Sequence, residues 1–351
     1  MNILRKILKA LLIAVLVIIV GFAGIIVYAL VSDYRPPEKT VLEVNDSTSL
    51  PFDTMALSFI TWNIGYGGLD KEMDFFYDGG NKVFTPKEQC LKNLSAVMSF
   101  LTGNDSIDFV LLQEVDRKSK RSYSLDELDV IGRHLNYVSK LFATNYKVFF
   151  VPVPLTSPMG KVYSGITTLS RFIPDSSARY SFPGHYGFPK QLFMLDRCFM
   201  VNRYRLKNGR DLLIINTHNE AFDPGEIRKA QMEYLRNFVT AEYQNGNYVV
   251  VGGDWNQCPP GFTPAFTQNQ VNTEQMVIPA DFLPSDWKWI FDNKTPSNRS
   301  VVAAYDPSST PTTVIDFFLL SPNVEPISVQ CIDLGFENSD HNPVRMQLKI
   351  K

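Results

Sequence analysis

Polar and ionisable residues recur at the ends of the apolar segments of this chain. The set comprises Asn63, Glu114, His218, Asp254 with Asn256, Asp316, and Asp340 with His341. Ligand sites in layered proteins gather outside strand ends, so six strands that each deliver such a side chain to one rim would build one polar site. Carboxylate and carboxamide oxygens suit Mg²⁺, whereas the sequence has no histidine cluster or thiolate pair that would favour Zn²⁺. The pattern predicts a site for a hard metal ion and a phosphate group.

Each of these residues also has an ordinary explanation when it is taken alone. A glutamate after a strand is usually a solvated loop residue, and Gly-Asp-x-Asn is a common turn in which the side chains bond nearby backbone. A lone histidine such as His218 is more often structural than catalytic. The hypothesis therefore depends on the joint occurrence of these residues, in one order along the chain.

The segments that must position these side chains alternate between strand-like and helix-like patterns. Hydrophobic runs predict strands at 57–63, 108–113, 212–217, 248–251, 314–320 and 344–350. Capping motifs predict helices that begin near Thr85, Ser124 and Asp223, and Asn208-Gly209 predicts a β-hairpin. Hairpins mixed with helices favour α+β layers over a purely parallel sheet.

The same patterns predict one catalytic domain, residues 56–351, without an internal linker, because the last strand reaches the end of the chain. Within it, residues 259–312 are the least regular stretch and are expected to form a long surface loop with one or two short helices. Residues 32–55 contain three prolines and several small polar residues, which predicts an extended tether.

Composition excludes several classes of protein. With 351 residues, 45% apolar and 20% charged, the chain is typical of a globular protein and not of a disordered one. Four cysteines without a CxxC pair are too few for a disulfide-built scaffold and argue against a structural zinc site. Beyond residue 32 the chain carries 31 Lys and Arg against 36 Asp and Glu, a formal charge of −5, without a basic stripe. This balance weighs mildly against a nucleic-acid substrate.

Residues 10–31 form an uncharged, mostly apolar run of 22 residues. At about 1.5 Å per residue, a helix of this length crosses the core of a bilayer. A cleaved signal peptide is the alternative, with Val27-x-Ala29 as the cleavage site, but the run exceeds the apolar core of about 7–15 residues typical of signals. Three basic residues precede the run, Arg5, Lys6 and Lys9. The positive-inside rule therefore places residues 1–9 in the cytoplasm and the domain on the extracytoplasmic side of the plasma (inner) membrane.

The order of the polar motifs resembles the endonuclease/exonuclease/phosphatase superfamily, which includes deoxyribonuclease I, bacterial sphingomyelinases and inositol polyphosphate 5-phosphatases. The matching pieces are TWNI (61–64), LQEV (112–115), SG…LSR (164–171), NTH (216–218), GDWN (253–256), IDF (315–317) and SDHNPV (339–344). The resemblance extends from Ala56 to the end of the chain. It implies an α+β, deoxyribonuclease I-like fold, a four-layer α/β/β/α sandwich with its active site at one rim, here preceded by one transmembrane helix.

The resemblance also implies a role for each residue on the side of the nucleophile. Asp254 is the general base for water, and Asn256 orients that base or the phosphate. His341 contacts the phosphate, while Asp316 bonds the other ring nitrogen of His341 and fixes its tautomer. His218 matches a histidine of the deoxyribonuclease and sphingomyelinase branches that serves acid/base or oxyanion-stabilising work.

On the metal side, the resemblance implies that Glu114 ligates the divalent ion, Mg²⁺ with Mn²⁺ as the alternative. Asn63 lies close to the metal and the scissile phosphate, and Asp340 is a carboxylate on the metal side or directly behind it. Arg171 matches an arginine that supports the rim and binds substrate. The segments 65–68 and 78–80 could form a rim loop.

Two departures from the family pattern affect substrate contacts more than the hydrolytic core. Asn219 follows NTH where family members commonly have Leu, and Val314 stands where many have Arg. The expected function is that of a membrane-anchored, metal-dependent hydrolase of phosphoesters, and His218 favours a phosphodiesterase of the nuclease or sphingomyelinase type. A phosphomonoesterase of the inositol-phosphatase type is the alternative. A non-catalytic binding module on the same fold is less favoured, because the core positions are intact.

The expected partners follow from the same reasoning. The substrate is a phosphoester, which leaves nucleic acid, a phospholipid headgroup and an inositol phosphate open. The membrane is contacted through the N-terminal helix, and no protein partner is predicted.

Overall fold

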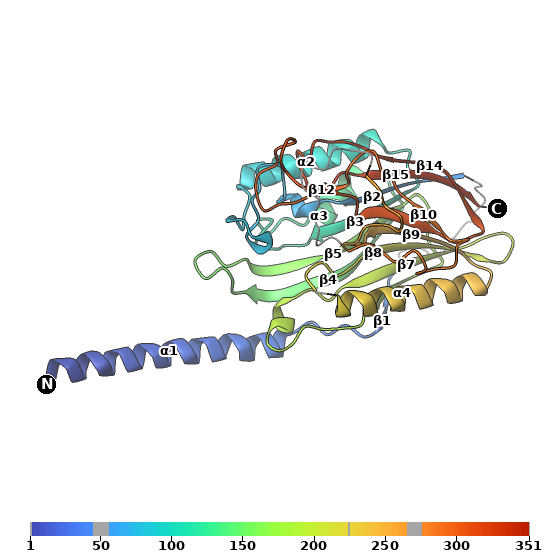
Figure 1. Ribbon diagram of the computed structural model, residues 1–351. Helices are drawn as coiled ribbons and strands as arrows, with labels where there is room; N and C mark the ends of the chain where they lie inside the picture. Colours follow the sequence, from blue (N-terminus) through green and yellow to red (C-terminus); the bar gives the residue numbers. More distant parts are fainter. Residues whose placement is uncertain (1, 45–55, 224, 265–275, 351) are drawn as a thin grey trace.

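Two β-sheets lie face to face in the computed structural model, which describes residues 2–44, 56–223, 225–264 and 276–350 (Figure 1). One sheet has six strands in the order β14 (Val324–Cys331), β15 (Val344–Ile350), β2 (Ala56–Asn63), β3 (Phe109–Asp116), β5 (Gly160–Ser170) and β4 (Ser139–Val151). The other has seven in the order β1 (Lys39–Leu42), β6 (Ser176–Ser181), β7 (Cys198–Arg205), β8 (Asp211–His218), β9 (Tyr248–Asp254), β13 (Asp316–Leu320) and β10 (Lys288–Ile290).

Helices cover the outer faces of both sheets. Helices α2 (Lys87–Gly103) and α3 (Glu127–His134) pack on the six-stranded sheet, where Val97 of α2 and Ile131 of α3 share a buried cluster with Val110 of β3. Helix α4 (Glu226–Gln244) packs on the seven-stranded sheet. Between the sheets, Phe59 lies between Phe109 and Phe318, with ring centroids 5.0 and 6.0 Å away. The four layers confirm the predicted α/β/β/α sandwich.

Strand direction explains why the polar motifs meet at one rim. β2 and β3 are parallel neighbours in one sheet, and β8 and β9 are parallel neighbours in the other, so four strands end at the same edge. β13 and β15 run antiparallel to β9 and β2, and they begin at that edge. The register pairs His218 with Asp254 and Asp254 with Asp316.

A glycine permits the close approach of β8 and β9 directly before these residues. Gly253 has a φ of +153°, and a Cβ there would lie 2.0 Å from the carbonyl oxygen of Thr217. Any other residue would therefore push the two strands apart and separate His218 from Asp254.

Most predicted elements are present, and the hairpin at Asn208-Gly209 joins β7 to β8. The strand predicted at 344–350 coincides with β15. The N-cap residue of α4 is Gly225, two residues after Asp223, but Asp223 Oδ2 does accept the backbone N–H groups of Ile227 and Arg228 in the first turn.

The two other capping predictions were wrong. The N-cap residue of α2 is Pro86 rather than Thr85. The Thr85 hydroxyl donates instead to the carbonyl oxygen of Gly68 at 2.7 Å. α3 is capped by Asp126 rather than Ser124, whose φ of +61° is left-handed. In both cases a tertiary contact or the local backbone overrides the sequence motif.

Two predicted irregular segments contain strands. Part of the expected tether is β1, which pairs antiparallel with β6 and so becomes the edge of a sheet; residues 45–55 lie outside the described residues. The described part of 259–312 contains the short strands β10, β11 (Asn298–Arg299) and the start of β12 (Thr312–Thr313). Residues 265–275 lie outside the described residues, so the expected short helices stay a prediction there.

Helix α1 (Asn2–Ser32) projects from the sandwich (Figure 1). From Ile3 to Ser32 it is long and apolar enough to cross a membrane. Most of its apolar side chains are exposed, whereas Ala29 near its end is buried. The predicted span 10–31 lies inside this helix.

Candidate active site

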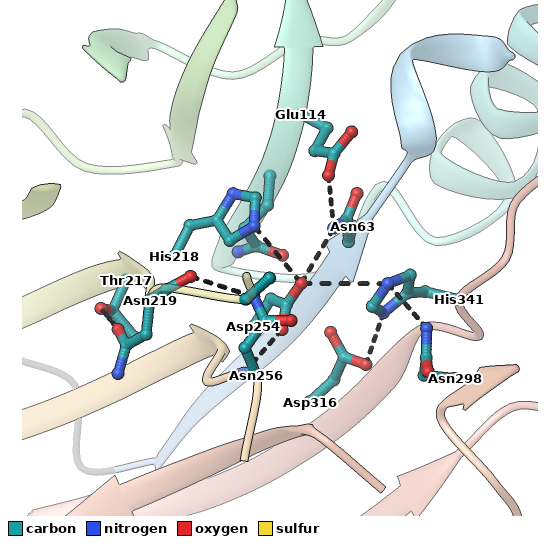
Figure 2. Close-up of polar contacts among 12 residues, drawn as sticks. Asn63, Glu114, Thr217, His218, Asn219, Asp254, Asn256, Asn298, Asp316 and His341 are labelled. Carbon is teal, nitrogen blue, oxygen red and sulfur yellow. Dashed lines mark hydrogen bonds and ion pairs between the residues drawn. The ribbon is translucent and has the colours of Figure 1, made fainter. Parts of the chain in front are cut away.

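Asp254 ends β9 and lies at the centre of the polar residues (Figure 2). Its Oδ2 accepts a hydrogen bond from Asn63 Nδ2 at 3.0 Å, and it lies 3.5 Å from His218 Nε2 and 3.8 Å from His341 Nε2. Its Oδ1 accepts the backbone N–H of Asn256 at 3.0 Å. The structure therefore gathers residues from four strand ends around one buried carboxylate.

Burial sets the proton affinity of Asp254. It raises the pKa of this carboxyl; the charge of His341 opposes the rise, and the charge of Asp316 reinforces it. A carboxylate with a raised pKa accepts a proton more readily, which is the property that a general base needs.

His341 and Asp316 form a tight pair. Nδ1 of His341 donates to Oδ2 of Asp316 at 2.8 Å, and the hydroxyl of Ser297 donates to the same oxygen at 2.7 Å. Burial lowers the pKa of His341, but the carboxylates of Asp316 and Asp340 outweigh it and raise that pKa to about 10. His341 therefore carries a positive charge at neutral pH, and Asp316 holds the ring in place.

His218 is the opposite case. Burial lowers its pKa well below the ordinary value, and the charges of Arg197, His341 and Arg121 add to this effect. The amide N–H of Asn145 faces Nδ1 at 3.4 Å, so the proton of the neutral ring belongs on Nε2, on the side of Asp254. His218 is thus a neutral hydrogen-bond donor, which suits the stabilisation of an oxyanion better than the transfer of a proton.

Asn256 acts on Asp254 through its backbone rather than its side chain. Its Nδ2 donates to the carbonyl oxygen of Asn219 at 3.0 Å, and this bond holds its left-handed backbone, with a φ of +50°. Asparagine tolerates this conformation better than most residues. This contact helps to aim the N–H of Asn256 at the base, and because it uses the backbone carbonyl of residue 219 it does not depend on the departure from the family pattern there.

Glu114 reaches the site through an irregularity in β3. The register between β3 and β5 shifts between Leu112 and Val115, and Glu114 has a φ of +55°. Such a bulge re-aims a side chain, and strained backbone of this kind gathers at functional sites. Oε1 of Glu114 lies 3.4 Å from Nδ2 of Asn63, which links it to Asp254.

Asp340 adds a second carboxylate beside Glu114. Burial raises its pKa to about 7, an effect opposed by the charge of His341 and increased by those of Glu114 and Asp78. Asp78 belongs to η2 (Phe76–Asp78), in the predicted rim loop, so that loop contributes a further acid. Three acidic side chains thus influence one another at this side of the site.

The donor set fits a hard divalent cation. Glu114 and Asp340 offer oxygen ligands whose mutual repulsion a cation would relieve. Oδ1 of Asn63 already accepts the N–H of Gly65 at 3.0 Å, so only its second lone pair could reach an ion. Asp254, Asp316 and His341 also bring one ligand atom each within 4.8 Å of one another. Because His341 is bound to Asp316 through its protonated Nδ1, we assign that second group to catalysis rather than to metal binding.

Arg171 does not belong to this site, and its predicted role was wrong. It follows β5, and Ser170 pairs with Phe109 at the beginning of β3, the end of the strand remote from Glu114. Its exposed side chain donates to the carbonyl oxygen of Asp105 at 3.1 Å. β5 runs antiparallel to β3, so only the beginning of the SG…LSR motif reaches the rim.

The structure adds residues that sequence reasoning missed. They are Asn145 beside His218, Asn298 with its Nδ2 at 3.0 Å from His341 Nε2, Ser297 on Asp316, and the buried cations Arg121 and Arg197. Asn145 and Arg197 belong to segments without a recognisable motif, and Asn298 lies in the irregular stretch, so no spacing in the sequence marks them.

The sequence matches a profile of the Endonuclease/Exonuclease/phosphatase family over residues 60–341. This range is most of the chain and contains every predicted site residue, so the protein belongs to this family. The family consists of phosphoester-hydrolysing enzymes, which supports a hydrolase. A search among curated proteins finds no match.

Solved structures share the fold at low sequence identity. An endonuclease/exonuclease/phosphatase from Beutenbergia cavernae is 16% identical, with a TM-score of 0.56, over 85% of this chain and 72% of that chain. One from Bacteroides vulgatus is 14% identical, with a TM-score of 0.52, over 85% and 100%. TDP2 from D. rerio, complexed with a single-strand DNA product, is 16% identical, with a TM-score of 0.51, over 84% and 99%.

Proposed function

We propose that this protein is a membrane-anchored, divalent-metal-dependent phosphodiesterase that cleaves by in-line attack of water activated by Asp254. One observation carries the proposal: a buried carboxylate of raised pKa lies between a charged imidazole and a neutral one, with Glu114 close by. Water gives its proton to Asp254 as its oxygen bonds to phosphorus, and the bond to the leaving oxygen breaks.

The two imidazoles serve the phosphate differently. His341, charged and held by Asp316, neutralises phosphoryl oxygens as negative charge builds. His218 donates a hydrogen bond from Nε2 to an oxyanion without adding a full charge. A divalent ion held by Glu114 and Asp340, with Asn63 beside it, would supply the remaining positive charge.

A phosphomonoesterase is the second candidate, and one observation favours it. A monoester carries more negative charge than a diester and needs more cations, and Arg197 and Arg121 both act on His218 electrostatically. Arg197 Nε lies 3.9 Å from Glu220 Oε2, yet within the described part of the chain neither Nε nor Nη1 donates a hydrogen bond. Arg121, by contrast, donates from Nε and Nη2 to the two carboxylate oxygens of Asp116.

The neutral state of His218 supports the diester as the preferred substrate of this proposal. We would measure kcat/KM of the full-length protein with Mg²⁺ for bis(p-nitrophenyl) phosphate and for p-nitrophenyl phosphate, in wild type and in His218→Ala. We expect the diester to be the better substrate, and His218→Ala to reduce its cleavage roughly 10–100-fold, because one oxyanion donor is lost. A better monoester substrate would support the second candidate, and turnover of neither would support a binding module.

The anchor and its orientation belong to the same proposal. α1 is long and apolar enough to span, and the three basic residues before its uncharged run favour a cytoplasmic N-terminus. The catalytic domain then lies on the extracytoplasmic side of the plasma membrane. An alkaline phosphatase fused to the C-terminus should be active in cells, and an inactive, fully expressed fusion would reverse the orientation.

A further inference from the structure

The hairpin formed by β4 and β5 extends beyond the active-site rim. Asn145 of β4 lies beside His218, and the next residue, Tyr146, pairs with Ser164 of β5. β4 continues to Val151, which pairs with Gly160. At about 3.3 Å per residue, these five further residues carry the hairpin roughly 15 Å past the catalytic residues.

The tip of this hairpin is apolar, and part of it is exposed: Val148, Val151 and Met159 pack into a core cluster, whereas Phe149, Val153 and Leu155 are exposed. Residues 148–160 contain no charged side chain, and Lys147 and Lys161 bracket them. The exposed fraction is 55% for Phe149 and 87% for Leu155. Apolar side chains gathered at a protruding tip mark an interaction surface.

The turn between β7 and β8 provides an internal comparison, because it lies at the opposite end of the sandwich. It is formed by Lys207, Asn208, Gly209 and Arg210, so it is polar and charged. A hairpin in this protein therefore does not need an apolar tip, and the composition of 148–160 calls for a separate explanation.

The backbone of the tip suits an environment with little water. Pro152, Pro154 and Pro158 have no N–H group to leave unsatisfied. The N–H of Met159 donates to the carbonyl oxygen of Val153 at 3.2 Å, and the N–H of Ser157 to that of Pro154 at 3.1 Å. Polar backbone groups cost free energy in lipid unless they are paired, and this turn pairs or lacks several of them.

Contacts with α1 fix the level of the hairpin relative to the predicted span. The Phe149 ring lies 4.5 Å from the ring of Tyr28, inside the uncharged run of α1. Lys147 Nζ lies 5.4 Å from the ring of Tyr34, directly after α1 ends. The chain beyond Lys147 is thus level with the last turns of α1. The β4–β5 hairpin and α1 both extend from the sandwich toward the same side (Figure 1).

We propose that the β4–β5 tip, residues 148–160, inserts into the lipid bilayer that α1 crosses, with Lys147 and Lys161 at the headgroups. The inference rests on the proposed membrane anchor. The lysines match the cations that flank membrane-embedded segments, where their long side chains reach the interface. The partner surface is lipid rather than protein, because the tip is continuous with a helix that is itself exposed and apolar.

Insertion of the tip turns the active-site rim toward the lipid surface. The hairpin is tied to the rim loop, since the Tyr77 hydroxyl donates to the carbonyl oxygen of Val153. It is tied also to the loop after Glu114, because Lys120 Nζ donates to the carbonyl oxygen of Pro158 at 2.8 Å. The site then faces phosphodiesters that are presented at the membrane surface.

The test uses full-length protein in vesicles of equal parts phosphatidylethanolamine and phosphatidylglycerol. All four native cysteines are buried, so single cysteines can be introduced and labelled with a polarity-sensitive fluorophore. The positions are Leu155→Cys at the tip, Val17→Cys in α1, and Ile327→Cys on β14 as the control. Ile327 is 55% exposed, like Phe149, but lies toward the other end of the sandwich.

We expect spin-labelled lipids to quench the fluorophore at positions 155 and 17 several-fold more than at 327. Quenching at 17, with position 155 no different from 327, would overturn the hairpin proposal and leave the anchor intact. No quenching at 17 would overturn the anchor, and the hairpin proposal with it. Protection of position 155 from a water-soluble quencher without quenching by the lipids would indicate a protein contact and also overturn the proposal.

Discussion

The two halves of the active site differ in how their charges are balanced. In the histidine half, Asp254, Asp316, His341 and His218, each carboxylate lies close to an imidazole, and His341 bonds Asp316 at 2.8 Å. In the carboxylate half, the negative charges of Glu114, Asp340 and Asp78 repel one another. Burial raises the pKa of Asp340; the charge of His341 opposes this rise, and the charge of Glu114 adds to it. The protein itself balances the charges of the first half, whereas the second would gain stability from a bound cation.

This difference separates two requirements of catalysis. The histidine half fixes a base and a charged group before substrate arrives, which is the preorganisation that lowers the barrier of a charged reaction. The carboxylate half stores repulsion that a divalent ion would relieve. Changes in the first half should therefore affect turnover, and changes in the second should affect metal binding.

Removal of metal should have the largest effect. A chelator should abolish hydrolysis of a soluble diester and Mg²⁺ should restore it, because the carboxylate half cannot neutralise a phosphate without a cation. Mg²⁺ should also raise the Tm of the wild-type protein, and this rise should shrink in Glu114→Gln. Glu325→Gln on β14, far from the site, is the control. Full activity in excess chelator would contradict the division into two halves.

Asp254→Asn should reduce kcat by about 10²–10⁴-fold, the range that one positioned base contributes. The substitution is isosteric, and the hydrogen bond from the Asn256 backbone can persist, so the fold should be retained. The Tm rise on addition of Mg²⁺ should stay close to that of wild type. If that rise disappears together with activity, Asp254 belongs to the metal site and the halves are not separate.

Asp316→Asn should have a smaller effect that depends on pH. The Asp316 charge helps raise the pKa of His341 to about 10, so removing it leaves only Asp340 and Asp254 to oppose the effect of burial, and that pKa should fall. His341 would then lose its proton at a lower pH, and activity should decline from a lower pH than in wild type. We expect a loss of roughly 10–100-fold near neutral pH, typical of a residue that orients a functional histidine. A pH profile of kcat/KM with an unmoved alkaline limb would refute the pairing.

Much of the histidine half could be predicted from the sequence. His218, Asp254 and Asp316 each adjoin a hydrophobic run, and parallel strands bring such positions to one rim whatever the details of the loops. The prediction for Arg171 was wrong because it treated β5 as another strand that ends at this rim. Nothing in its motif showed that β5 runs antiparallel to β3 and ends at the far side.

The surroundings of the site could not be predicted, because they depend on tertiary contacts. Asn145 meets His218 across 73 positions of sequence, and Asn298 meets His341 across 43. Ser124 was expected to cap a helix but has a left-handed backbone, and Asp126 caps α3 instead. The apolar run at 148–160 was not singled out from the sequence, because its position beside α1 appears only in the structure.

Cysteine substitution should have the smallest effect, and it tests whether chemistry is confined to the two halves. Cys258 follows the histidine half and faces Thr313 Oγ1 at 3.2 Å, while Cys90 lies behind Gly67 on the carboxylate side. Both are buried, and burial raises the pKa of each thiol, so neither is a reactive thiolate. Replacing all four cysteines with Ser or Ala should cost about 1 kcal/mol of stability each and leave kcat/KM for a soluble diester unchanged. Loss of turnover in a folded Cys258→Ala protein, with Cys90→Ala active, would extend the histidine half to a residue that neither its position nor its contacts assign to it.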